Sequence, residues 1–320
     1  MRYGMLCRRG MGMPIIGGSD SMATRSRGAG AGFGWLTNGI RVGFERPKLL
    51  FGGAALLVVA CLLPSLITVP MQIYAAKAGT PPSAATSLTT MAISLLYALL
   101  IIPLYAGYLQ LVSAAERQQP ARVSDIFMPY RQGEAWRLIG LGLANFVVYI
   151  GGIAIIVLAA GRGIIGWYMQ ALAAQASHQL PPALPGSFWT TMALLMVFGL
   201  WMMGFYAISL GQVALNRRSV FGAIGDGIGG ALKNVLPLLV FALSSLLAWI
   251  VAIIVFLIVA LLLGLIARLI SPWLMVAVLV PLYIGLLLLM FTVMFGVMYH
   301  LWRDVCGDDV ANAMPPPLAA

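Results

Sequence analysis

The sequence predicts an all-α polytopic membrane protein with six transmembrane helices. The first observation is composition: of 320 residues, 61% are hydrophobic and only 9% are charged. A soluble domain averages about 45–50% apolar and about 25% charged residues. The second observation is a series of long uncharged stretches, and the third is the one-sided placement of basic residues between them. Together they exclude a soluble enzyme, a disordered chain and a secreted disulfide scaffold.

The number of spans follows from the uncharged stretches. A bilayer core about 30 Å thick requires about 20 apolar residues of helix. The stretch 163–216 is long enough for two spans, but its first half carries glutamines and three prolines and is predicted to be a loop with one interfacial helix near Trp167. The six predicted spans are about 51–71, 89–112, 138–160, 188–213, 236–264 and 273–298. The fifth is long enough that it must tilt or protrude.

Prolines fall in or at the ends of several spans: Pro64, Pro70, Pro103, Pro237 and Pro281. In lipid, such prolines are tolerated when neighbouring groups satisfy the freed carbonyl. We interpret them as kinks that serve helix packing. The alternative is a gate or substrate site built from a broken helix.

The charges predict the orientation. With six spans, all but three of the 19 basic residues and all nine acidic residues fall on one side. The three exceptions are Lys77, Arg162 and Arg268. Because cytoplasmic loops carry the excess of Lys and Arg, both termini are predicted to be cytoplasmic. The span interiors contain no Asp, Glu, Lys or Arg, so the span count and the orientation support each other.

The predicted domain organisation has one membrane domain between two tails. Residues 1–34 are rich in Gly, Met and Arg and lack the apolar region of a secretory signal peptide, so we expect a disordered cytoplasmic tail. Residues 35–305 form the six-helix domain, and residues 306–320 form a short cytoplasmic tail.

Three segments on the basic side look alike, and each leads into a span. They read WLTNGIRVGFERPK, VSDIFMPYRQGEAWR and SVFGAIGDGIGGALKN, at residues 35–48, 123–137 and 219–234. Each offers apolar residues at helical spacing, which is typical of a short amphipathic helix in the interface. We therefore expect three repeats of an interfacial helix plus a helical hairpin. The alternative is that any basic loop between spans looks amphipathic.

These segments also carry a resemblance. The stretches YAGYLQLVSAAERQQPARVSDIFMPYRQGEAWRLIGLGL (105–143) and ALKNVLPLLVF (231–241) resemble a family of uncharacterised six-helix bacterial inner-membrane proteins. That family is similar in layout to the membrane domain attached to some glycerophosphodiester phosphodiesterases. The resemblance covers roughly Gly34 to Val305 and implies a multi-pass protein of the bacterial cytoplasmic (inner) membrane. It implies no catalytic residue, because the phosphodiesterase's catalytic domain is soluble and has no counterpart in this sequence.

No catalytic, cofactor or metal site is predicted. The three cysteines, including Cys7, form no CxxC pair, whereas a structural zinc site needs four N or S ligands, usually in close pairs. Two GxGxxG matches, 161–166 and 225–230, lack the strand and helix context of a dinucleotide site. We interpret their glycines as allowing tight turns or close helix approach. The span interiors hold only weak polar groups, which argues against an ion-coupled transporter.

The aromatic residues gather mainly at span ends, as anchors at the two membrane–water interfaces do. The predicted anchors are Trp136, Trp167, Tyr168, Trp189, Trp273 and Trp302.

The leading functional hypothesis is a non-enzymatic membrane protein that interacts with lipids or with other membrane proteins. Basic residues beside amphipathic helices attract anionic phospholipids, at about 1 kcal/mol per residue near the surface. The predicted contacts for such lipids or for a protein partner are Arg117, Arg131, Arg137, Arg217 and Arg218.

Several alternatives stay open. The arginines could serve only to set the topology, and a homo-oligomer is compatible with the sequence. Six spans could also form a channel or an uncoupled small-molecule transporter, and a more remote alternative is a lipid-active membrane enzyme. Nucleic acid is not an expected partner, because the basic residues lie beside long apolar runs instead of on a soluble face.

Overall fold

A computed structural model describes residues 24–78, 84–177 and 179–307, and these residues form helices and connecting turns without any strand. Six helices are long and apolar enough to cross a membrane: Pro47–Tyr74, Thr86–Glu116, Ala135–Ala160, Phe188–Ala214, Val235–Ala267 and Trp273–Cys306. The predicted all-α fold with six candidate spans is therefore confirmed.

The first span consists of two helices, and each of the others is one continuous helix. The span helices are α2 (Pro47–Leu62), α3 (Ser65–Ala78), α4 (Ala84–Glu116), α6 (Ala135–Ala160), α8 (Phe188–Ala214), α10 (Val235–Ile270) and α11 (Pro272–Cys306). The shorter elements are α1 (Ala31–Glu45), the 3-10 helix η1 (Val123–Phe127), α5 (Met128–Arg131), α7 (Ile164–Ala176) and α9 (Val220–Lys233).

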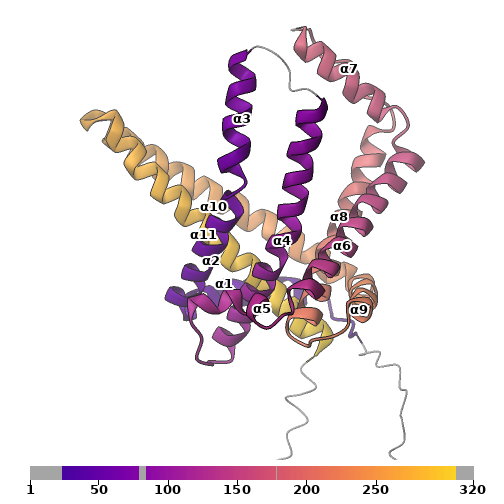
Figure 1. The fold of residues 1–320 in the computed structure, drawn as a ribbon, viewed down its shortest axis with the longest axis vertical. Coiled ribbons are helices and arrows are strands. Elements are labelled where there is room, and N and C mark those ends of the chain that lie inside the picture. The colour runs from indigo at the N-terminus through magenta and orange to yellow at the C-terminus, as the bar shows by residue number, and fades with distance from the viewer. Residues whose placement is uncertain (1–23, 79–83, 178, 308–320) are drawn as a thin grey trace, which may run out of the picture.

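The spans form three helical hairpins that meet at one end of the molecule and diverge toward the other (Figure 1). α1, η1, α5 and α9 lie where the hairpins meet, whereas α7 lies at the opposite end. The pair α10–α11 leans strongly away from α4. We call the meeting point the basic end, because every described Lys and Arg except Lys77, Arg162 and Arg268 belongs to the segments that gather there.

The packed core occupies the basic end. The largest fully buried side chains are aromatic and come from the adjoining halves of α4, α8 and α11: Tyr108, Phe205, Phe295, Tyr299 and Trp302. The opposite halves of the spans expose large apolar side chains such as Ile155 and Leu261. Lipid solvates such side chains as well as a neighbouring helix does, so the hydrophobic effect does not draw these halves together.

α1 crosses α11 at very short range through two glycines. A Cβ on Gly39 would lie 2.7 Å from the backbone nitrogen of Val297, and a Cβ on Gly296 would lie 2.7 Å from the carbonyl oxygen of Gly39. Neither position can accept a side chain without moving backbone. Small residues at this crossing allow the interfacial helix to pack directly against the last span.

The glycines of the two GxGxxG matches serve a turn and a helix contact. Gly163 has a φ of 92° in the turn between α6 and α7, a conformation that favours glycine. A Cβ on Gly227, in α9, would lie 2.1 Å from Ser209 Oγ in α8. Pro64 separates α2 from α3, while Pro70, Pro103 and Pro281 lie inside helices.

The segment 123–137 is not the continuous amphipathic helix that we expected. It contains η1 and the four-residue α5, followed by a turn before α6 begins at Ala135. Gly133 takes a positive φ of 75° in that turn, which ends the short helix. The first and third of the three segments do form helices, α1 and α9.

The N-terminal tail boundary and the end of the sixth span also differ from the prediction. Residues 24–30 of the expected tail are held by hydrogen bonds to the last helices and residues 31–34 belong to α1, whereas residues 1–23 lie outside the described residues. α11 continues through Cys306, past the expected end of the sixth span near 298, because Tyr299, Leu301 and Trp302 pack into the core. Residues 308–320 lie outside the described residues as well.

We expect Gly296→Ala to destabilise the protein by about 1–3 kcal/mol, the usual effect of inserting a methyl group into a packed site. Gly285→Ala is the matched control, because it lies in the same helix and a Cβ at that position would meet nothing within 4 Å. The thermal unfolding midpoint of Gly285→Ala should equal or exceed that of the wild type, because Ala favours helix over Gly by about 1 kcal/mol. Thermal unfolding of the two variants in detergent measures the difference, and equal midpoints would contradict the close crossing.

Candidate functional site

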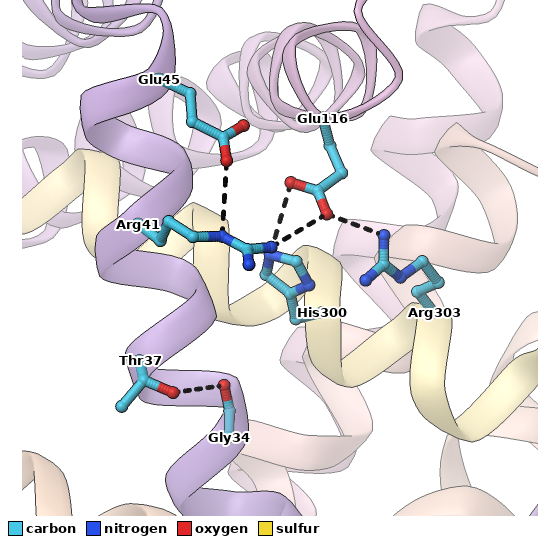
Figure 2. Close-up of polar contacts among 7 residues, drawn as sticks. All are labelled: Gly34, Thr37, Arg41, Glu45, Glu116, His300 and Arg303. Atoms are coloured by element: carbon cyan, nitrogen blue, oxygen red, sulfur yellow. Dashed lines mark hydrogen bonds and ion pairs between the residues drawn. The ribbon is translucent and has the colours of Figure 1, made fainter.

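Glu116, the last residue of α4, is the centre of a charge cluster that joins three helices (Figure 2). Arg303 Nη1 of α11 donates a 3.0 Å hydrogen bond to Glu116 Oε1, and Arg41 Nη2 of α1 lies 3.7 Å from the same oxygen. A carboxylate at a helix C-terminus faces the negative end of the helix dipole, which is unfavourable without cations nearby. The two arginines supply them and tie α1, α4 and α11 together.

The cluster is buried on the side of His300. Glu116 is 11% exposed and His300 is 2% exposed, and His300 Nε2 lies 3.9 Å from Glu116 Oε2. This distance is too long for a hydrogen bond, and both atoms are buried without a hydrogen-bond partner in the described part of the chain. Arg41 also lies 3.4 Å from Glu45, one turn along α1. The cluster is therefore held by its arginines.

Asp226 of α9 is the centre of a second buried cluster. Arg218 Nε lies 2.5 Å from Asp226 Oδ2, and Gln212 Nε2 of α8 donates a 2.8 Å hydrogen bond to the same oxygen. Asn216 Nδ2 in turn donates to Gln212 Oε1 at 2.7 Å. Burial raises the pKa of the Asp226 carboxyl above its ordinary value of 3.8, although Arg218 and Gln212 act in the opposite direction. The cluster fastens α9 to the end of α8.

A third set of bonds holds residues 24–30, which we call the N-terminal strap. The Arg27 backbone N–H donates to Asn234 Oδ1 at 2.8 Å, and Asn234 Nδ2 donates to the Arg25 carbonyl at 2.9 Å. The Arg27 guanidinium lies 3.0 Å from Asp304, which also accepts a hydrogen bond from Trp35 Nε1. The strap thereby links α1 to the ends of α9 and α11.

The five arginines predicted to contact lipid or a partner have different environments. Arg137 donates to the carbonyls of Arg217 and Arg218 at 2.8 and 2.7 Å and pairs with Glu134. Arg218 pairs with Asp226, and Arg117 also has an interaction partner. Arg131 and Arg217 are exposed and form no ion pair with any described residue. Arg137 and Arg218 therefore hold the turn between α8 and α9, and contact with lipid or a partner stays a prediction for these arginines.

Four of the six predicted aromatic anchors are exposed at helix ends: Trp136, Tyr168, Trp189 and Trp273. Trp167 is half-buried and donates from Nε1 to the Pro182 carbonyl at 3.0 Å. Trp302 is only 1% exposed and packs against Gly211, where a Cβ would lie 2.3 Å from the indole Cγ. Its assignment as an interfacial anchor is wrong, because α11 continues past it and turns its ring into the core.

A polar cavity of about 340 Å³ lies at the basic end between α4, the η1–α5 segment and the end of α8. Its polar lining consists of Gln110, Ser113, Gln119, Asp125, Gln132 and Arg217. Only Arg217 was among the residues predicted from the sequence. The glutamines carry no recognisable motif, and packing of α4 against α8 brings them together. The one available signal was their position on or beside the basic-side ends of spans.

Both helix ends beside this cavity adopt an unusual backbone conformation. Gln118, just after α4, has a φ of 54°, and Arg217, just after α8, has a φ of 52°. The Gln119 N–H donates to the Ala114 carbonyl at 2.9 Å, and the Arg218 N–H donates to the Gln212 carbonyl at 3.1 Å. These bonds close both helices with the left-handed residue that is usually glycine. A non-glycine residue there costs about 1–2 kcal/mol.

No group of three or more His, Cys, Asp or Glu side chains that could hold a metal ion occurs in residues 24–78, 84–177 and 179–307. Cys7 lies outside these residues. No family model, curated protein or solved structure matches the chain. The fold and the clusters define its class, a polytopic α-helical membrane protein with a polar, basic end. Of the resemblance inferred from the sequence, the six-helix layout is the part that the structure supports.

The raised pKa of Asp226 predicts a pH dependence of stability. Since the folded protein binds this proton more tightly than the unfolded chain does, this contribution to the free energy of unfolding falls as pH rises from about 3.8 through the folded-state pKa. In Asp226→Asn this contribution is absent. We therefore expect the difference in thermal unfolding midpoint, wild type minus variant, to decrease as the pH rises through this range. Thermal unfolding in detergent from about pH 3 to pH 7 measures it, and a difference that grows with pH would refute the assignment.

Proposed function

We propose that this protein is a non-enzymatic component of the bacterial cytoplasmic membrane whose basic end faces the cytoplasm and binds anionic phospholipids. One observation carries the proposal: exposed apolar side chains and exposed cations occur together at the basic end. Phe33 and Phe44 of α1, Phe221 of α9 and Trp136 of α6 are all exposed, the last two at 88% and 79%. Such side chains insert at the boundary between headgroups and acyl chains.

Exposed cations lie in the same region. Lys48, at the start of α2, and Arg131, at the end of α5, are exposed and form no ion pair within the described residues. Each contributes an attraction of about 1 kcal/mol toward an anionic leaflet. The cytoplasmic orientation rests on the excess of Lys and Arg at this end.

An apolar groove of about 290 Å³ supports the same proposal. It lies between α1, α10 and α11, and its lining includes Leu36, Ile40, Phe44, Trp249 and Met290. The lining is nearly all hydrocarbon and reaches from the interfacial helix along two spans. It suits an acyl chain whose headgroup remains at the level of α1.

The channel alternative would require an open path where the three hairpins meet. The place where the three hairpins meet is filled by the side chains of Tyr108, Phe205 and Phe295, which are fully buried. A membrane-protein partner would use the same exposed side chains as the lipid, so lipid and protein partners remain alternatives for this surface. We favour lipid because the exposed surface combines cations with apolar side chains at a single level.

We expect the double variant K48Q/R131Q to retain anionic lipid about thirtyfold less well than the wild type, because two cations near the surface are lost at about 1 kcal/mol each. The matched control is K77Q/R162Q, which removes two exposed basic residues from the opposite end. Native mass spectrometry of protein purified in mild detergent measures bound phosphatidylglycerol and cardiolipin. Equal retention by the wild type and both variants, with unchanged thermal midpoints, would refute the proposal.

A further inference from the structure

The polar cavity between α4, η1–α5 and the end of α8 is lined by two side chains of opposite charge that do not pair with each other. Arg217 and Asp125 both line it, and no ion pair joins them to each other or to another described residue. Asp125 Oδ2 accepts a 2.8 Å hydrogen bond from the Arg122 backbone N–H, which fixes the carboxylate at the start of η1. A ligand that satisfies both side chains must carry a positive and a negative group.

Gln110 frames the cavity where α4 meets α8. Its Nε2 donates to the Ala214 carbonyl at 3.0 Å, which fixes the amide between the two helices. Its Oε1 is buried among protein atoms. Arg217 and Asp125 are therefore the side chains of the lining that a charged ligand can pair with.

The size and the frame of the cavity also suit a small ligand. Its volume of about 340 Å³ lies at the lower end of the range for small-molecule sites. The left-handed residues Gln118 and Arg217 end α4 and α8 beside it and set the backbone that presents Gln119 and Arg217. Such backbone strain tends to gather at binding sites.

We propose that this cavity binds a small zwitterion, in which an ammonium group lies close to a phosphate or carboxylate. The anion pairs with Arg217, and the ammonium pairs with Asp125. Gln119 and Gln132 complete the lining with neutral amides. This ligand chemistry has two sources: the headgroup of phosphatidylethanolamine and a free zwitterion such as O-phosphoethanolamine. The proposal is independent of anionic lipid binding, because neither Lys48 nor Arg131 lines the cavity.

The test uses the full chain in detergent micelles. Calorimetry measures binding of O-phosphoethanolamine, with inorganic phosphate and ethanolamine as half-ligands, and native mass spectrometry measures retained phosphatidylethanolamine. We expect the zwitterion to bind at least about tenfold more tightly than either half-ligand, because each half-ligand leaves one charge unpaired. If both O-phosphoethanolamine and phosphatidylethanolamine bind, the site recognises the zwitterion in either form. If only the lipid binds, the site is specific for the lipid headgroup. Failure of both probes to bind the wild type overturns the proposal, as does inorganic phosphate that binds as tightly as the zwitterion.

Variants of the lining separate this site from the lipid-binding surface. We expect Arg217→Gln and Asp125→Asn each to weaken zwitterion binding about tenfold, whereas K48Q/R131Q leaves it unchanged. Asn at position 125 still accepts the helix-capping hydrogen bond. Should either variant show a lowered thermal midpoint, Gln132→Ala, at an exposed lining position, serves instead and should weaken binding severalfold. Unchanged affinity in the folded lining variants overturns the proposal, while loss of anionic lipid from K48Q/R131Q alone concerns only the proposed function.

Discussion

In a lipid bilayer the hydrophobic effect does not drive the helices of a protein together, as it does in water. An apolar side chain gains little by moving from acyl chains to a neighbouring helix, so membrane helices associate where close packing and polar bonds hold them. In this protein both occur at the basic end. The glycine crossing of α1 with α11 and the buried aromatic rings provide the packing there. The clusters around Glu116, Asp226 and Asn234 provide the bonds, and each joins different helices or ties the strap to them.

The same constraint explains why so many charges at the basic end are paired. A net charge of +10 suggests a strongly basic surface, yet Arg27, Arg137, Arg218 and Arg303 bind acidic side chains or backbone carbonyls. Arg218 and Arg303 neutralise the largely buried carboxylates of Asp226 and Glu116. The surface attraction for lipid therefore depends on fewer cations than the composition suggests, and Lys48 and Arg131 are the clearest of them.

The polar cavity results from the same meeting of helix ends. α4 and α8 both stop at the basic end with a left-handed residue, and the η1–α5 segment lies over the space beside them. The helices are held together by direct bonds such as that from Gln110 to Ala214. Two side chains of opposite charge, Asp125 and Arg217, line the space that remains between them.

The sequence alone determined the helical class, the six spans and the gathering of charges at one end. These are local properties: hydropathy summed over about 20 residues defines a span, and the charges between spans fall on whichever end the hairpin topology dictates. Tertiary structure decided which arginines form ion pairs, that Trp302 points inward, that residues 24–34 are held in place and that three glutamines share a cavity. Glu116 and Arg303, or Gln110 and Ala214, are far apart in the chain, and only the packing of one helix against another places them within hydrogen-bond distance.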